Sequence, residues 1–434
     1  MKKENELPYK QNKYSWFPLD NLAKIFPSNT SSRLTTLFRI TAIMTAPVKI
    51  SLLQNAFKNL LNRCPYFKVQ LKAGFFWYYF QSNPAEPKIM ADSKYPCMKM
   101  PFKKEGVLPL RVKSFKNRIS VEFSHLLTDG SGGLSFLKAL IVEYLQLSGI
   151  EIIELNDFIK VNDKPGEEEW EDSFRKFYQK SIPVPNKISE AFHIPFKFID
   201  KKKYYITTGI LSAGNIIKKA KEKNVSLTEF LVALYFDAIQ DLYFSSEIKK
   251  NNQNPIRISI PVNLRQMYQS KTMRNFFLTV SPEIDPRLGR FSFDEILQKV
   301  YHFMMVEVNE KYINQQIKRN VGGEVHPVIR SLPLFIKNIG LSYIYNFYGD
   351  NQYTTNFSNL GQVKMPEPLS DYIKGFDFLP PPNPKYKISC TVISFQDRLS
   401  ITFGRLIEES DIERLFFTKI TKMGIHVKIE TNKE

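Results

Sequence analysis

The residues of this sequence best suited to chemistry are His125 and Asp129, which lie in one short polar turn and are followed by Gly130. A histidine in such a turn titrates near neutral pH, so it can take a proton from a hydroxyl or an amine at little thermodynamic cost. Because the turn is not helical, Asp129 can point back into the protein while His125 points into a cleft. We therefore expect His125 to act as a general base and Asp129 to fix the loop through a buried ion pair.

The surrounding residues predict the elements that hold this turn. Apolar Ile119, Val121 and Phe123 alternate with polar residues before it, as in a strand, and apolar residues recur at helical spacing from Leu134 onward. Glycines mark the turn between the two patterns. In the predicted order of strand, turn and helix, a rigid scaffold can present catalytic side chains on a short loop.

The same strand pattern occurs a second time near the end of the chain. Residues 117–129 and 397–409 align without a gap, and both are followed by an apolar pattern of helical period. The base and the acid are both replaced in the second segment, His125 by Arg405 and Asp129 by Glu409. The sequence therefore predicts an internally duplicated fold in which one copy holds the base.

The pattern His-x-x-x-Asp-Gly at residues 125–130 resembles the motif of the acyltransferase superfamily that shares the chloramphenicol acetyltransferase fold. The resemblance implies an α+β fold of two lobes in pseudo-twofold arrangement, each a mostly antiparallel mixed sheet with flanking helices. It also implies a tunnel between the lobes, with His125 at its middle and with donor and acceptor entering from opposite faces.

Within that superfamily, two differences favour the bacterial alcohol acetyltransferase and wax ester synthase-like branch. Peptide-synthetase condensation domains usually carry a second histidine where this chain has Ser124, and plant BAHD acyltransferases carry an Asp-Phe-Gly-Trp-Gly loop that this chain lacks. The resemblance to that branch continues at residues 261–265, Pro-Val-Asn-Leu-Arg, and at Asn275. Arg265 is our predicted partner for Asp129, because a guanidinium binds a carboxylate bidentately and stays charged when buried. Arg257 is the competing partner, and an exposed Arg265 is the alternative.

Residues 358–361, Ser-Asn-Leu-Gly, resemble the Ser-Asn-x-Gly segment that lines the tunnel opposite the histidine in the same families. The resemblance implies that Ser358 and Asn359 donate hydrogen bonds to the oxyanion of a tetrahedral intermediate, with Gly361 shaping the turn. The same composition suits an ordinary turn at the end of a strand.

Length and charge limit the remaining classes of function. The 434 residues carry a net charge of +18, which favours anionic partners such as nucleic acid, a membrane surface or coenzyme A. We find neither a nucleic-acid-binding motif nor zinc-ligand spacing, so we expect no nucleic-acid partner, no metal and no permanently bound cofactor. The predicted domains are an N-terminal lobe (1–150), a proline-containing connector (151–203) and a C-terminal lobe (204–434), with a segment of the last crossing to the first.

Cysteine usage and apolar segments bear on the compartment. The odd number of cysteines, Cys64, Cys97 and Cys390, predicts buried thiols in a reducing compartment, the cytoplasm. The polar N-terminus does not predict a signal peptide. Residues 331–349 predict a buried or amphipathic helix rather than a membrane span, and peripheral membrane contact stays open if the acceptor is a lipid.

Two further segments carry expectations about packing. The aromatic residues of 75–80 are expected to be a strand in the core of a sheet. Residues 16–27 are expected, from composition alone, to anchor the terminus to the core through four apolar side chains, Trp16, Phe17, Leu19 and Phe26. The family resemblance places this opening segment over the mouth of the active site instead.

These observations predict an acyltransferase that moves an acyl group from acyl-CoA to a hydroxyl group, or with less support to an amine, of a small acceptor. Two alternatives stay open. One is condensation-like transfer from an acyl group carried on a carrier protein, and the other is a two-lobed binding protein without catalysis.

Overall fold

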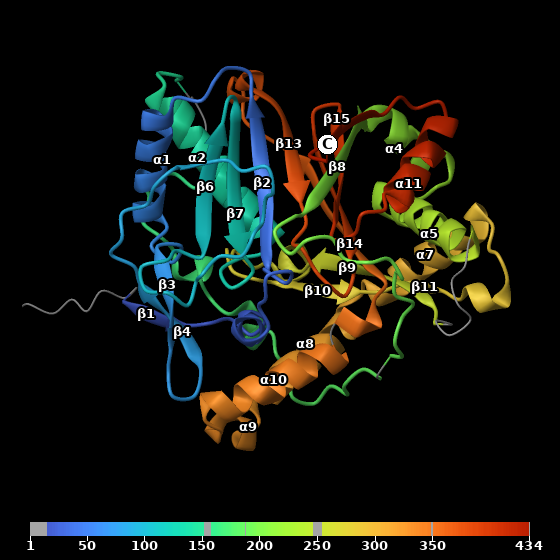
Figure 1. Ribbon diagram of the computed structural model, residues 1–434. Helices are drawn as coiled ribbons and strands as arrows, with labels where there is room; N and C mark the ends of the chain where they lie inside the picture. Colours follow the sequence, from blue (N-terminus) through green and yellow to red (C-terminus); the bar gives the residue numbers. More distant parts are fainter. Residues whose placement is uncertain (1–14, 152–157, 187, 246–253, 349, 434) are drawn as a thin grey trace, which may run out of the picture.

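The computed structural model describes residues 15–151, 158–186, 188–245, 254–348 and 350–433, which form two lobes side by side above a lower layer of helices and a small sheet (Figure 1). The N-terminal lobe is a five-stranded sheet in the order β13-β2-β7-β6-β5. Its strands are β2 (Leu37–Met44), β5 (Met90–Ala91), β6 (Leu110–Phe115), β7 (Arg118–Ser124) and β13 (Ile373–Leu379). Helices α1 (Ile50–Arg63) and α2 (Gly130–Leu147) cover its outer face.

The C-terminal lobe is an eight-stranded mixed sheet in the order β10-β9-β12-β14-β15-β8-β16, with β11 paired to β9. Its strands are β8 (Tyr205–Ser212), β9 (Ile256–Asn263), β10 (Phe277–Val280), β11 (Glu283–Ile284), β12 (Thr355–Val363), β14 (Ile388–Phe395), β15 (Arg398–Arg405) and β16 (Lys428–Thr431). Its helices are α4 (Ala213–Glu222), α5 (Leu227–Ser245), α7 (Phe293–Glu307) and α11 (Asp411–Lys422). Only β12 makes parallel pairs in this sheet, with β9 and β14, among the residues described.

The lower layer combines a three-stranded sheet with three α-helices and one 3-10 helix (Figure 1). Its elements are β1 (Trp16–Pro18), β3 (Val69–Ala73), β4 (Tyr78–Ser82), the 3-10 helix η1 (Ala23–Ser28), α8 (Glu310–Val325), α9 (Pro327–Ser331) and α10 (Leu334–Tyr348). The short elements elsewhere are η2 (Glu167–Glu169), α3 (Ser173–Lys176), α6 (Arg265–Tyr268), η3 (Pro286–Leu288), η4 (Asp350–Gln352) and η5 (Leu369–Tyr372). In the described part of the chain no helix is both long enough and apolar enough to cross a bilayer.

The strand order repeats between the lobes. β2, β7 and β6 are antiparallel neighbours in one sheet, and β8, β15 and β14 are antiparallel neighbours in the other. Helix α2 follows β7, and α11 follows β15. The two-lobed α+β architecture and the internal repeat predicted from the sequence are therefore both present.

One strand of the C-terminal half completes the N-terminal sheet. β13 pairs antiparallel with β2, with Phe378 opposite Ile40. Asp377 of this strand is buried and binds two arginines that occupy equivalent positions of the repeat, Arg118 of β7 and Arg398 of β15, the latter at 2.9 Å. Burial alone would raise the pKa of Asp377, but the two guanidiniums outweigh it and hold the pKa below its usual value. This carboxylate ties both copies of the repeat together.

Three expectations about packing can now be compared with the structure. The three cysteines are free and buried, as predicted. The core strand predicted at residues 75–80 is wrong at its start: β4 begins at Tyr78, and Phe75 is 72% exposed because it lies at the tip of the β3–β4 hairpin. The anchor predicted at 16–27 holds for Phe17 and Leu19, which are buried, but is wrong for Trp16, which is exposed on β1.

We predict that Asp377→Ala lowers the free energy of unfolding by about 3–5 kcal/mol, because two arginines then lose the carboxylate between them. The contribution should be present at neutral pH and lost as the pH falls below about 4, since the folded-state pKa is depressed. Urea unfolding at several pH values measures both effects. Asp294→Asn, which breaks an exposed pair with Lys223, is the control and should cost less than about 1 kcal/mol. Equal losses in the two variants would contradict the role of Asp377.

Candidate active site

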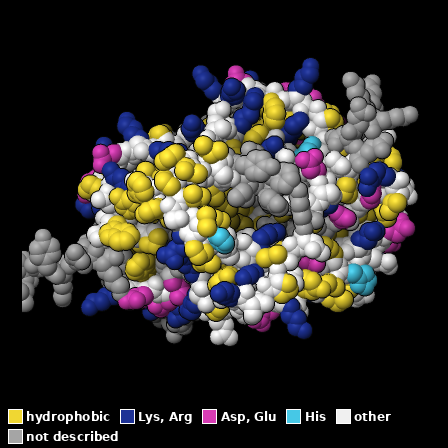
Figure 2. All heavy atoms as spheres, turned by 90° about the horizontal axis from the view of Figure 1, so that it is seen from below, with side chains coloured by type: hydrophobic (Ala, Val, Ile, Leu, Met, Phe, Trp, Pro, Cys, Tyr) yellow, Lys and Arg dark blue, Asp and Glu magenta, His cyan; other side chains and the backbone are white. Residues whose placement is uncertain are grey.

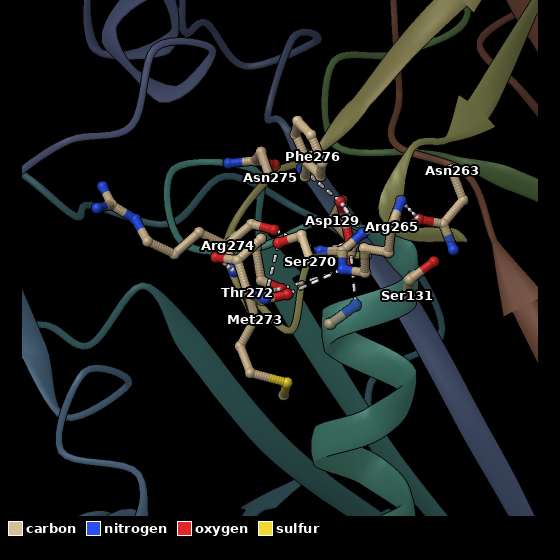
Figure 3. Close-up of polar contacts among 12 residues, drawn as sticks. Asp129, Ser131, Asn263, Arg265, Ser270, Thr272, Met273, Arg274, Asn275 and Phe276 are labelled. Carbon is tan, nitrogen blue, oxygen red and sulfur yellow. Dashed lines mark hydrogen bonds and ion pairs between the residues drawn. The ribbon is translucent and has the colours of Figure 1, made fainter. Parts of the chain in front are cut away.

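Asp129 is the N-cap of α2, and its carboxylate joins the two lobes (Figure 3). It accepts a hydrogen bond from Gly132 N at 3.0 Å and, from the other lobe, one from Phe276 N at 2.8 Å. Arg265 forms a bidentate pair with it, with distances of 2.9 Å from Nη1 to Oδ2 and 3.0 Å from Nη2 to Oδ1. This is the ion pair predicted from the sequence. The competing Arg257 instead pairs with Glu283.

The loop that carries His125 is held against residues 272–276 by further contacts, which leave little room for larger side chains. The Thr128 hydroxyl donates to the carbonyl oxygen of Met273 at 2.5 Å. Arg265 also donates to the carbonyl oxygens of Thr272, at 2.8 Å, and Arg274. A Cβ atom at Gly132 would overlap the Met273 carbonyl oxygen, and one at Gly130 would press on the side chain of Leu360. Close approach of the backbone thus requires glycine at position 132, whereas at position 130 the flexible end of Leu360 can shift.

The ring of His125 is oriented by Asn275. The Asn275 amide donates to the His125 carbonyl oxygen at 2.8 Å and to the carboxylate of Asp20 at 3.0 Å, so its oxygen is the acceptor that faces Nδ1 of the imidazole at 3.4 Å. Nδ1 then carries the proton, and Nε2 is left as the basic nitrogen. Asp20 is buried, and burial raises its pKa to about 6 although Arg274 opposes the rise. The network runs from Arg274 through Asp20 and Asn275 to the imidazole.

A cavity of about 350 Å³ opens between the two lobes, and His125 lines it. Three aromatic rings surround the imidazole, with ring-centre distances of 5.8 Å for Phe26 of η1, 4.7 Å for Phe38 of β2 and 5.8 Å for Phe277 of β10. Burial in this apolar setting lowers the pKa of His125 below 6.5, and Asp129 and Asn275 offset only part of the shift. The ring is therefore neutral at pH 7 and able to accept a proton.

Ser358 and Asn359 of β12 line the same cavity. Asn359 uses one N–H on the Thr228 hydroxyl at 3.0 Å, and its side-chain oxygen accepts from Gly361 N at 2.8 Å. Gly361 has φ = +75° beside an irregularity in the pairing of β12 with β14. Among the residues described, Gly361 does not line the cavity. Its part is to shape the strand that presents Ser358 and Asn359.

In the second copy of the repeat, the position of His125 is taken by a structural ion pair. Arg405 is buried, pairs with Glu413 of α11 and donates to the Thr207 hydroxyl at 2.9 Å. None of these three residues lines the cavity that contains His125. The two copies have thus diverged into one site and one packing interaction.

Several residues of the site escaped the sequence analysis. Asp20 binds Asn275 across 255 residues of sequence and is itself paired with Arg274, the residue before Asn275. Phe26 covers the imidazole although we had assigned it to the core on composition alone. The one sequence signal for the position of Phe26 was the family resemblance, which places residues 16–27 over the mouth of the site. No local pattern pointed to Asp20, because its contacts depend on the tertiary fold.

Comparison with known proteins identifies the fold. No family model and no curated protein matches this sequence. Among solved structures, the chain is similar to the epimerization domain from the third module of tyrocidine synthetase B, with 11% identity, a TM-score of 0.57 and coverage of 94% of this chain and 95% of that chain. It is also similar to the trichothecene 15-O-acetyltransferase TRI3 from Fusarium sporotrichioides, with 10% identity, a TM-score of 0.58 and coverage of 97% and 99%.

A third similar structure is TRI101 from F. sporotrichioides in complex with coenzyme A and T-2, with 11% identity, a TM-score of 0.58 and coverage of 95% of this chain and 99% of that chain. The chain therefore has the two-lobed fold of condensation-type domains and chloramphenicol acetyltransferase-like acyltransferases, as its sequence predicted. Identities this low establish the fold and leave the activity to be argued from the site.

We predict that Asp129→Asn lowers the free energy of unfolding by about 3–5 kcal/mol, since Arg265 is then left without a counter-charge between the lobes. Chemical denaturation of the variant and its parent measures the difference. Asp285→Asn removes a surface partner of Arg287 and should change stability by less than about 1 kcal/mol. An Asp129→Asn protein that unfolds with the parent would show that the pair has no structural role.

Proposed function

We propose that the protein transfers an acyl group from acyl-CoA to a hydroxyl group of a small molecule, with His125 as the general base. The observation that carries the proposal is the imidazole itself: it lines a cavity between the lobes, and Asn275 holds its Nδ1 so that the basic Nε2 is free for the acceptor. A neutral imidazole held by a polar partner on one nitrogen is the arrangement that general-base catalysis needs.

The reaction can be written with this chain's residues in each role. Nε2 of His125 takes the proton of the acceptor hydroxyl while the oxygen attacks the thioester carbonyl. A tetrahedral intermediate forms, its C–S bond breaks, and the ester is released. The coenzyme A thiolate leaves and takes up the proton from the imidazolium. Because the acceptor attacks the thioester directly, no acyl-enzyme forms.

The negative oxygen of that intermediate needs a hydrogen-bond donor. Both residues predicted for this role line the cavity, and Ser358 is the better candidate because the side chain of Asn359 is already bonded to Thr228 and to Gly361. A positioned donor of this kind contributes about 2.7–4 kcal/mol to the stability of the transition state.

Charge favours coenzyme A as the form of the donor. Arg319 of α8 lines the cavity, and the chain as a whole carries +18, so a phosphorylated donor is attracted to it. TRI101, with which the chain shares its fold, was crystallised with coenzyme A.

A carrier-protein donor has less support. Ser124, at the position of the second histidine of condensation domains, is fully buried and bonded to the Thr36 hydroxyl at 3.3 Å and to Leu126 N at 3.2 Å. It therefore does not contribute a second polar group to the cavity.

We predict that His125→Ala lowers acyl transfer at least about a hundredfold, because the acceptor then loses its base. Release of free thiol from a panel of acyl-CoAs with small alcohols measures the rate. His302→Ala, at an exposed position of α7, is the matched control and should keep the parental rate. Near-parental turnover by the His125→Ala protein would remove His125 from this role, and no turnover by the parent with any thioester would favour the non-catalytic alternative.

The pH dependence follows from the environment of the imidazole. Burial lowers the pKa of His125 below 6.5, so the neutral, active form should already predominate at pH 7. We expect kcat/KM for the acceptor to be flat above about pH 7 and to fall on acidification as the ring is protonated. A profile of kcat/KM from pH 5 to pH 9 tests this. A rise that continues well above pH 7 would contradict a base with a lowered pKa.

A further inference from the structure

An apolar surface patch lies on the lower layer of the molecule, where the tip of the β3–β4 hairpin meets α9 and the start of α10. Figure 2 shows hydrophobic side chains gathered on this face. The residues that make up the patch are Phe75, Phe76, Val328, Phe335, Ile336 and Ile339. Four of them are more than half exposed: Phe75 by 72%, Val328 by 61%, Phe335 by 68% and Ile339 by 75%. Exposed apolar groups this concentrated mark an interaction surface.

The first turns of α10 have inverted polarity. Leu334 and Lys337 are buried, while Phe335, Ile336 and Ile339 face outward. The Lys337 ammonium lies 4.0 Å from the ring centre of Trp77 and donates to the carbonyl oxygens of Phe76 at 3.1 Å and Arg330 at 3.0 Å. A helix at a surface that faces water points its charged side chains outward and its apolar side chains inward. Here the lysine points inward, and the phenylalanine and the two isoleucines point outward.

The patch is held in place by hydrogen bonds of the backbone and of side chains. Leu334 N donates to the carbonyl oxygen of Phe75 at 2.8 Å, which joins the hairpin tip to the start of α10. Asn338 donates to the Tyr78 hydroxyl at 3.4 Å and accepts from the Ser28 hydroxyl at 2.6 Å. These hydrogen bonds join the β3–β4 hairpin, η1 and α10, so the fold itself holds the exposed aromatic rings at the surface.

Two exposed basic residues lie on or near the segments that carry the patch. Arg330 belongs to α9, and the Lys103 ammonium lies 5.4 Å from the ring centre of Tyr78, the first residue of β4. Burial is the main cause that lowers the pKa of Lys337, and the positive charges of Arg330 and Lys24 lower it further. The chain as a whole carries a net charge of +18, so two copies repel each other, whereas an anionic surface attracts the protein.

From this combination we propose that the patch docks the protein on the surface of an anionic lipid bilayer. Outward aromatic and aliphatic side chains enter the region between headgroups and acyl chains, and the neighbouring lysine and arginine contact lipid phosphates. The docking is peripheral, in keeping with the absence of a spanning helix among the described residues. It does not depend on the proposed acyl transfer.

The test is vesicle binding by the full chain. Parent protein is mixed with vesicles of phosphatidylcholine and phosphatidylglycerol in equal parts, or of phosphatidylcholine alone, and the bound fraction is measured by sedimentation. We expect binding to the anionic vesicles that weakens as salt is raised. The triple variant Phe75→Asp, Phe335→Asp and Ile339→Asp should bind at least about tenfold less, because three apolar groups are lost and three negative charges gained.

Leu288→Asp is the matched control, since Leu288 is 78% exposed but lies in η3, outside the patch, and it should bind as the parent does. Arg330→Glu with Lys103→Glu should weaken binding to anionic vesicles and remove most of its salt dependence. Thermal melting checks the fold of each variant, and if the triple variant melts early, Ile339→Asp alone carries the test. The proposal is overturned if the parent does not bind anionic vesicles, if the triple variant binds equally, or if the patch instead closes a dimer that the triple variant separates.

Discussion

The ion pair between Asp129 and Arg265 is the contact on which the geometry of the site depends. Its two ends belong to different lobes: Asp129 caps the helix that follows the strand of His125, and Arg265 begins α6 after β9. The same carboxylate accepts from Phe276 N, next to Asn275. One buried charge therefore fixes both the loop that carries the imidazole and the segment that orients it. Without that charge Arg265 would be left unpaired at the contact between the lobes.

The two copies of the duplicated fold differ at the position of His125. In each copy, one residue lies at the end of a central strand. In the first copy this residue is His125, which lines the cavity, and in the second it is Arg405, which forms a buried pair with Glu413. Asp377 joins the two copies through Arg118 and Arg398. The symmetry thus provides contacts between the lobes, and its loss at one position leaves an imidazole beside the cavity.

The fold and the centre of the site could be predicted from the sequence where the signal is local or carried by a motif. Strand periodicity identified β7 and β15, and the chemistry of a guanidinium pointed to Arg265 as the partner of Asp129. The helical spacing from Leu134 onward predicted α2 but missed its start, because the glycines that we had assigned to a turn form the first turn of the helix, which begins at Gly130. The Asn275–Asp20 contact could not be predicted in this way, since 255 residues separate its partners. Phe75 and Trp16 were misjudged for a related reason: aromatic content predicts a core only when another layer covers the strand, and here no layer covers the hairpin tip.

The cavity and the apolar patch share a structural support. Helix η1 lines the cavity through Phe26, whose ring lies 5.8 Å from that of His125, and the last residue of the same helix, Ser28, is bonded to Asn338 of α10. On the side of α8, Lys24 of η1 binds Glu324 at 2.6 Å. One short helix therefore contacts both the helix that carries the patch and the imidazole in the cavity. Because packed interiors leave few voids, η1 is a support that the surface patch and the wall of the cavity have in common.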